Sequence, residues 1–97
     1  MPGPALEAET VVARAPDAVA APVDGRLVVL DPIGDRYARL NPAAAVLWER
    51  LAEPAPVQAL AQALAERYGI APERAAEDAA RAVRALIDRG MAVVVEG

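Results

Sequence analysis

The sequence of 97 residues contains no cysteine, histidine, serine, lysine or phenylalanine, and its only threonine is Thr10. Nucleophilic and general-base catalysis draws chiefly on serine, cysteine, threonine, lysine, histidine and the carboxylates. Of these groups, essentially only the carboxylates remain here, together with two tyrosines. The composition therefore argues against a free-standing enzyme and favours a protein that binds something.

The missing residue types also bear on cofactors and location. Without cysteine the chain has neither a disulfide framework nor a thiolate metal site. A metal would need oxygen ligands alone, and the acidic residues lack the spacing of a calcium-binding loop. We therefore expect no metal and no other cofactor. No apolar run approaches the ~18 residues that cross a bilayer, and the first ten residues lack a secretion-signal pattern, so we expect a cytoplasmic protein without a membrane partner.

Alanine and arginine dominate what is present. Alanine accounts for 25 residues, and all ten basic residues are arginine. A chain of this size forms one small domain that buries about two-thirds of the surface it exposes when unfolded. The net charge of −4 is unfavourable for nucleic-acid binding, which depends on clustered basic side chains that neutralise phosphates. We therefore expect a binding partner other than nucleic acid.

Three segments with strand patterns precede the first helical pattern. RLVVLD (26–31) has four consecutive branched apolar residues between turn signals, and RYARL (36–40) alternates apolar and polar residues. AVAAPV (18–23) comes before them, joined by an Asp-Gly turn. Pro22 limits this segment to a sheet edge, because proline cannot donate a ladder hydrogen bond. We expect a three-stranded antiparallel meander whose first and third strands are its edges.

The start of the chain allows two descriptions. Residues 1–16 contain three prolines and little periodicity, so we expect a flexible arm followed by a binding domain over 17–97. The stretch TVVARA (10–15) is an alternative, because it has the composition of a short strand.

The third strand passes directly into a helix at Asn41-Pro42. Asn41 is a strong helix cap, because its side-chain oxygen can accept a hydrogen bond from a free helical N–H. Pro42 suits the first helical position, where its missing N–H costs nothing. Apolar spacing then predicts three helices and a short final strand that could return to the sheet, over residues 42–52, 57–68, 73–89 and 91–95.

The same spacing predicts which helical side chains are buried. They are Ala44, Leu47, Trp48 and Leu51 in the first helix, Val57, Leu60, Ala61, Leu64 and Tyr68 in the second, and Ala76, Ala79, Ala80, Val83, Leu86 and Ile87 in the third. The order of elements is β-β-β-α-α-α with a possible terminal strand, which is an α+β arrangement.

Two runs, GDRYARLNPAAAVLWERL (34–51) and ERYGIAPERAAEDAARAVRALIDRGMAVV (66–94), resemble the family of the pyrroloquinoline quinone (PQQ) biosynthesis protein PqqD. This family is also known as the RiPP recognition element of peptide natural-product biosynthesis. The matching features are the hairpin, a Leu-Asn pair before an alanine-rich helix, a Tyr-Gly helix end, and a leucine followed by glycine at the end of the last helix.

The resemblance implies a winged-helix-like domain without catalytic activity. Such a bacterial domain binds the leader of a ribosomally made precursor peptide, as a peptide chaperone, and presents it to a modifying enzyme such as a radical SAM protein or a leader-cleaving protease. The leader is implied to pair with the third strand and to pack against the third helix. The residues implied are Arg36, Tyr37, Ala38, Arg39 and Leu40 on the strand, and Asp78, Arg81, Ala82, Ala85 and Arg89 on the helix.

Two other functions stay open. ERYGIAPERAAED (66–78) has the pattern of a helix-turn-helix, typical of a winged-helix DNA-binding regulator, although three of residues 73–78 are acidic and would repel phosphate. The chain is alternatively a structural subunit of a larger enzyme, with its edge strand permanently covered. The site residues have simpler explanations too: Tyr37 as a cross-strand packing residue, and the arginines of the third helix as a solvated face.

Overall fold

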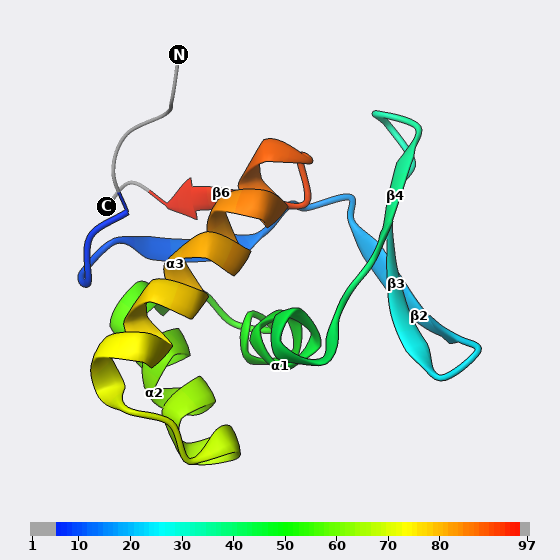
Figure 1. The fold of residues 1–97 in the computed structure, drawn as a ribbon. Helices are drawn as coiled ribbons and strands as arrows, with labels where there is room; N and C mark the ends of the chain where they lie inside the picture. Colours follow the sequence, from blue (N-terminus) through cyan, green and yellow to red (C-terminus); the bar gives the residue numbers. More distant parts are fainter. Residues whose placement is uncertain (1–5, 96–97) are drawn as a thin grey trace.

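The computed structural model describes residues 6–95; residues 1–5 and 96–97 lie outside the described part. Its elements, in chain order, are β1 (Val11–Arg14), β2 (Val19–Val23), β3 (Arg26–Asp31), β4 (Arg36–Arg39), α1 (Pro42–Arg50), β5 (Ala55–Pro56), α2 (Val57–Tyr68), α3 (Pro72–Asp88) and β6 (Ala92–Val95). Within the described residues these elements form three helices and two three-stranded sheets, which confirms the α+β class, and Figure 1 shows their arrangement. None of the helices within residues 6–95 is both long and apolar enough to span a membrane.

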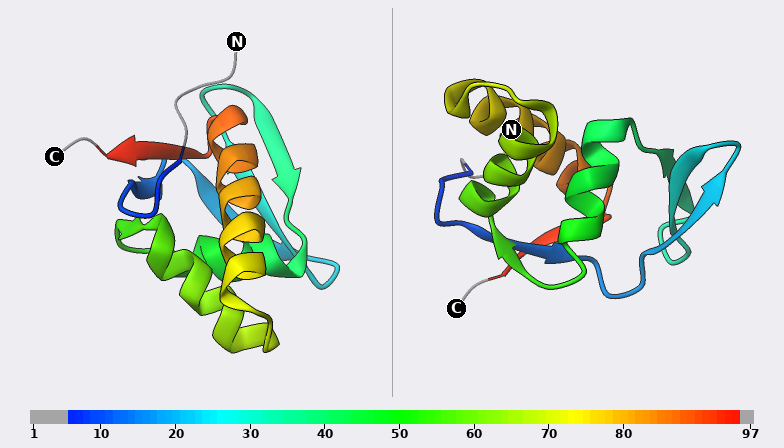
Figure 2. Two further views of the ribbon diagram at one scale, coloured as in Figure 1. Left: turned by 60° about the vertical axis from the view of Figure 1, so that its left-hand side comes forward. Right: turned by 90° about the horizontal axis from the view of Figure 1, so that it is seen from below.

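The predicted meander is confirmed as a sheet with the strand order β2-β3-β4. Asp24 and Gly25 both have positive φ, 50° and 79°, as a tight hairpin turn requires. Val29 of β3 lies opposite Ala38 of β4, and both are buried, so one face of the meander packs on the rest of the protein. The meander lies to one side of the molecule, with α1 between it and α2 (Figures 1 and 2).

A second sheet, with the order β5-β1-β6, corrects two expectations. The final strand does not return to the meander but pairs antiparallel with β1, with Val11 opposite Val95. Of the two descriptions of residues 1–16, the structure has the strand, because Val12 is fully buried at the centre of this sheet. Residues 1–5 of the expected arm lie outside the described part.

The junction from β4 into α1 is confirmed. The N–H of Ala44 donates to Asn41 Oδ1 at 2.8 Å, and Pro42 occupies the first helical position. Because Asn41 satisfies one of the free N–H groups at the start of the helix, the chain changes from strand to helix with no intervening loop. The junction therefore fixes the direction of β4 relative to the helices.

The buried faces of α1 and α2 agree with the predicted ones except at Ala63, which is buried although it was not predicted to be, and at Tyr68, which is 45% exposed. Tyr68 is the last residue of α2, and Gly69, with φ of 63°, ends the helix directly after it. On α3 the buried side chains are Ala75, Ala79, Val83 and Leu86.

Ala76 was predicted to be buried but is exposed, and Ala80 and Ile87 are half-buried at the margin of the face. Alanine occurs on every side of α3, and its small side chain costs little when exposed. The apolar pattern therefore did not determine which side of α3 faces the core.

Candidate functional site

β4 forms an edge of the meander, and no strand within residues 6–95 pairs with its outer side. The N–H of Leu40 donates to the C=O of Leu27 at 2.8 Å. Hydrogen-bonded and non-hydrogen-bonded pairs alternate along an antiparallel ladder. Ala38 therefore also bonds to β3, whereas the main-chain N–H and C=O groups of Tyr37 and Arg39 point to the outer side. This edge can accept a further strand.

The opposite edge of the meander is less suited to pairing. The same alternation directs the main-chain groups of Ala20 and Pro22 in β2 away from β3. Pro22 has no N–H, and its ring covers that point of the edge. β4 contains no proline. The β2 edge of the meander is therefore poorly suited to pairing with another strand, whereas the β4 edge is well suited to it.

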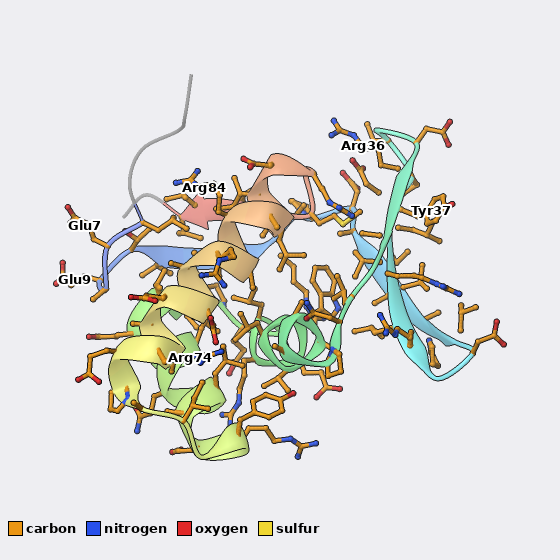
Figure 3. All side chains as sticks on the ribbon, in the orientation of Figure 1. Glu7, Glu9, Arg36, Tyr37, Arg74 and Arg84 are labelled. Atoms are coloured by element: carbon orange, nitrogen blue, oxygen red, sulfur yellow. The ribbon has the colours of Figure 1, made fainter. Side chains whose placement is uncertain are left out.

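Side chains alternate along β4 between the two faces of the meander. Ala38 and Leu40 are only 3% and 5% exposed, on the face toward the helices. Tyr37 is 71% exposed, and Figure 3 shows it pointing away from the helices while Arg36 lies on the opposite side of the strand. An additional strand on β4 would therefore also present one face to the helices and one face to solvent.

The space between β4 and α3 is hollowed. One cavity of about 170 Å³ is lined by Ala38, Arg39, Leu40, Asn41, Ala44, Ala82, Ala85, Leu86 and Arg89. A second cavity of about 340 Å³ is lined by Asp35, Arg36, Tyr37, Arg89 and Met91. Arg89 lines both cavities, and we call the two together the β4–α3 groove.

The groove has an apolar interior and a basic rim. The side chains of Ala82 and Ala85 on α3 leave room opposite the strand, as the small residues there predict. Two arginines, Arg36 on β4 and Arg89 at the end of α3, line the groove with a single carboxylate, that of Asp35. The groove therefore suits a chain with apolar side chains and at least one negative charge.

The structure brings the predicted site residues together except for Asp78 and Arg81. Asp78 lies further toward the start of α3 and lines a separate cavity of about 380 Å³ with Tyr68 and Ile70, among others. Its carboxylate is 3.7 Å from Arg74 Nε and 3.2 Å from Arg81 Nη1. The side chain of Arg81 is 74% exposed, so this triplet fits the solvated face that the sequence offered as an alternative. Contact of any of the predicted residues with a peptide stays a prediction.

Sequence reasoning missed several residues of the groove, namely Asp35, Asn41, Ala44, Leu86 and Met91. Leu86 lies one helical turn from Ala82, so helical spacing could have found it. Asn41 and Ala44 had been assigned only to the start of α1. Met91 reaches the groove because the chain reverses at Gly90, where φ is 75°, and no local signal places its side chain there.

The groove has the chemical features of a binding surface. Within residues 6–95 no group of three or more acidic side chains is placed to hold a metal ion. The groove offers main-chain hydrogen-bonding groups, an apolar interior and guanidinium groups, which together recognise an extended peptide. The helix-turn-helix alternative is weakened because Glu73 and Glu77 are exposed at the start of α3, where they would face phosphates.

This chain is similar to known proteins in sequence and in fold. The family model described as "Coenzyme PQQ synthesis protein D (PqqD)" matches residues 26–92, a range that includes β4 and α3. The structure described as "Lasso peptide synthetase B1 complexed with the leader peptide" is 30% identical, covering 84% of this chain and 96% of that chain, with a TM-score of 0.72. The structure "TbiB1 in Complex with the TbiA(beta) Leader Peptide" is 19% identical over 88% of this chain and 99% of that chain, with a TM-score of 0.76, and shares the fold. No curated protein sequence matches significantly.

Proposed function

Because this chain belongs to the PqqD family, we propose that it binds the leader of a ribosomally synthesised precursor peptide and presents that peptide to a modifying enzyme. The observation that carries the proposal is the intact outer edge of β4 beside the β4–α3 groove. Two proteins of the same fold are described as complexes with leader peptides, which supports a peptide as the ligand. The PqqD family consists of non-catalytic binding domains, and the chemistry on the precursor belongs to the partner, such as a radical SAM protein or a leader-cleaving protease. A cytoplasmic location stays a prediction.

The leader adds a fourth strand to the meander. Tyr37 and Arg39 each offer one outward N–H and one outward C=O to this strand. Each main-chain hydrogen bond contributes about 0.5–1.5 kcal/mol net, because water satisfied the same groups before binding. Ordering a disordered leader costs about 2–5 kcal/mol or more. The main-chain bonds therefore set the register of the leader but cannot by themselves supply its affinity.

Side-chain anchors supply the remaining affinity. An apolar side chain that becomes fully buried contributes about 1.5–3 kcal/mol, and the cavity over Ala82 and Ala85 offers a place for one. The guanidinium groups of Arg36 and Arg89 favour a leader that carries a carboxylate near this anchor. We propose a leader with an apolar residue facing α3 and an acidic residue close to it.

Calorimetry with a synthetic leader tests the proposal. The first step is to search the genes beside that of this chain for a short precursor and a modifying enzyme, and the leader of that precursor is then the probe. We expect micromolar or tighter binding, about −8 kcal/mol, and no binding of a leader with the same composition in scrambled order. Absence of binding at millimolar concentration, or equal binding of the scrambled peptide, would contradict the proposed function.

A further inference from the structure

β6 forms an edge of the second sheet, and no strand within the described residues pairs with its outer side. Its side chains Val93, Val94 and Val95 are 40%, 39% and 39% exposed. Apolar edges of this kind pair readily with other chains, and proteins usually protect them with proline, charged side chains or very short strands. β6 has the sequence Ala-Val-Val-Val, which contains neither a proline nor a charged residue.

The other three edges of the two sheets each have one of these protections. Pro22 interrupts β2, and β5 has only two residues, the second of which is Pro56. β4 carries the charged residues Arg36 and Arg39. Among the four edge strands in the described part of the chain, β6 alone is unprotected, which indicates that another strand covers it.

The main chain of β6 has its free hydrogen-bonding groups at Val94. The N–H of Ala15 donates to the C=O of Met91 at 2.9 Å, and the register of β1 and β6 continues from this pair. Because hydrogen-bonded and non-hydrogen-bonded pairs alternate along an antiparallel ladder, Val93 and Val95 bond to β1. The N–H and C=O of Val94 therefore point away from β1, to the open side of the sheet.

A second copy of the same strand fits this edge. In an antiparallel arrangement about a twofold axis at Val94, the N–H of each copy's Val94 donates to the C=O of Val94 in the other copy. Val93 of one copy then lies opposite Val95 of the other, and such apolar cross-strand pairs stabilise a sheet. The chain has a net charge of −4, but this edge has no charge, so two copies meet here without placing like charges opposite each other.

We propose that this chain forms a homodimer by antiparallel pairing of β6 with β6 of a second copy, which joins the two second sheets into one sheet of six strands. β6 runs away from the meander (Figures 1 and 2), so the second copy is added away from the outer edge of β4. The dimer therefore has two open β4–α3 grooves. This inference does not depend on the proposed function.

The small size of the contact indicates a weak dimer. A strand of four residues is about 13 Å long, and stable interfaces bury about 1,200–2,000 Å² in total. One such strand from each copy buries far less. We therefore expect a reversible dimer with a Kd of about 10–100 µM, as is typical of small, transient interfaces.

Sedimentation equilibrium of the whole chain, at concentrations on both sides of this Kd, tests the proposal. The average mass should rise with concentration from 10.1 kDa towards twice that value. Val94→Pro removes the outward N–H without breaking a bond to β1, and it should weaken the dimer by at least about 10-fold. Val23→Glu is the control, because Val23 is an equally apolar, 45% exposed residue on the edge strand β2, and it should leave the dimer unchanged.

A pair of charge variants tests the arrangement about the twofold axis. Val94→Glu and Val94→Lys each place like charges opposite each other, and each should weaken its own dimer by at least about 10-fold. An equimolar mixture of the two variants should dimerise at least as tightly as the wild type, because opposite charges then face each other. Thermal unfolding close to that of the wild type shows that each variant is folded, and if Val94→Pro unfolds, the two charge variants carry the test.

A wild-type chain that stays monomeric at about ten times the expected upper Kd would overturn the inference. Dissociation of the dimer by Val23→Glu would also overturn it, because the copies would then meet through the meander, and so would a mixture of Val94→Glu and Val94→Lys that stays monomeric. None of these results affects leader binding by the monomer. Leader that slowed hydrogen exchange of the Val94 amide in the monomer would place the leader on β6, and would contradict both this inference and the proposed leader site on β4.

Discussion

Proline at position 37 removes one hydrogen-bond donor from the outer edge of β4. The N–H of Tyr37 points away from β3, so its loss breaks no hydrogen bond inside the meander. The Tyr37 side chain is 71% exposed, so its removal costs little packing. The preceding residue, Arg36, is already in a strand, the conformation that a residue before proline prefers. Tyr37→Pro should therefore leave the domain folded, with an unfolding temperature close to that of the wild type.

The effect of Tyr37→Pro on leader binding should be large. The leader loses one main-chain hydrogen bond, and its carbonyl group is left against the proline ring without a donor. Leaving such a group unsatisfied costs about 1–3 kcal/mol, which corresponds to an affinity about 5-fold to 150-fold lower. Calorimetry with the synthetic leader measures this loss, and thermal unfolding measures the stability of the same sample.

Two comparison variants separate the main chain from the side chain. Tyr37→Ala keeps the N–H and should lower affinity by less than about fivefold, since only the exposed ring is lost. Ala38→Pro removes an N–H that bonds to β3 and should destabilise the meander itself. The reasoning would be refuted if folded Tyr37→Pro bound the leader as tightly as the wild type, or if Tyr37→Ala lost as much affinity as Tyr37→Pro.

Three further predictions concern the groove and its support. Arg89→Glu should weaken leader binding by about 5-fold to 10-fold, and this loss should become smaller at higher salt concentration, which screens the charges. Arg67→Glu on α2 is the control. If both variants weakened binding equally, Arg89 would have no specific role in the groove. Ala85→Leu should fill the cavity over α3 and lower leader affinity at unchanged thermal stability. Ala76→Leu is the control, because Ala76 is exposed on the same helix, and it should leave affinity unchanged. If Ala85→Leu bound the leader normally, the apolar side chain of the leader would have to bind elsewhere. Asn41→Ala should lower the free energy of unfolding in urea by about 1 kcal/mol, because Ala44 N–H loses its acceptor, and an unchanged value would show that the cap is not needed.

The meander and its junction with α1 could be predicted because their signals are local. An Asp-Gly turn, an alternating strand and Asn41-Pro42 each act over a few residues, and the structure confirms the elements they specify. The edge position of β4 followed from the order of the strands. The position of the groove could be predicted, because the resemblance already implied a site formed by β4 and α3. The full set of residues that line it could not.

The second sheet could not be predicted in the same way. Val11 pairs with Val95 and Val12 pairs with Ala55, so its register depends on contacts between distant parts of the chain. Arg14 illustrates how such contacts are fixed: its Nε and Nη2 donate to the Trp48 carbonyl oxygen at 3.0 and 2.6 Å, and its guanidinium lies 4.5 Å from the indole centroid. No sequence pattern indicates that the Arg14 side chain connects β1 to α1, because Arg14 and Trp48 lie far apart in the sequence.

Hydrogen exchange of individual β4 amides tests the central claim most directly. In the protein without leader, the Ala38 amide, bonded to β3, should exchange slowly, and the outward amides of Tyr37 and Arg39 should exchange quickly. Saturating leader should slow exchange at Tyr37 and Arg39 by at least about 10-fold, because both amides then donate to the added strand. Leader binding that left these two amides as fast as before would contradict strand addition on β4.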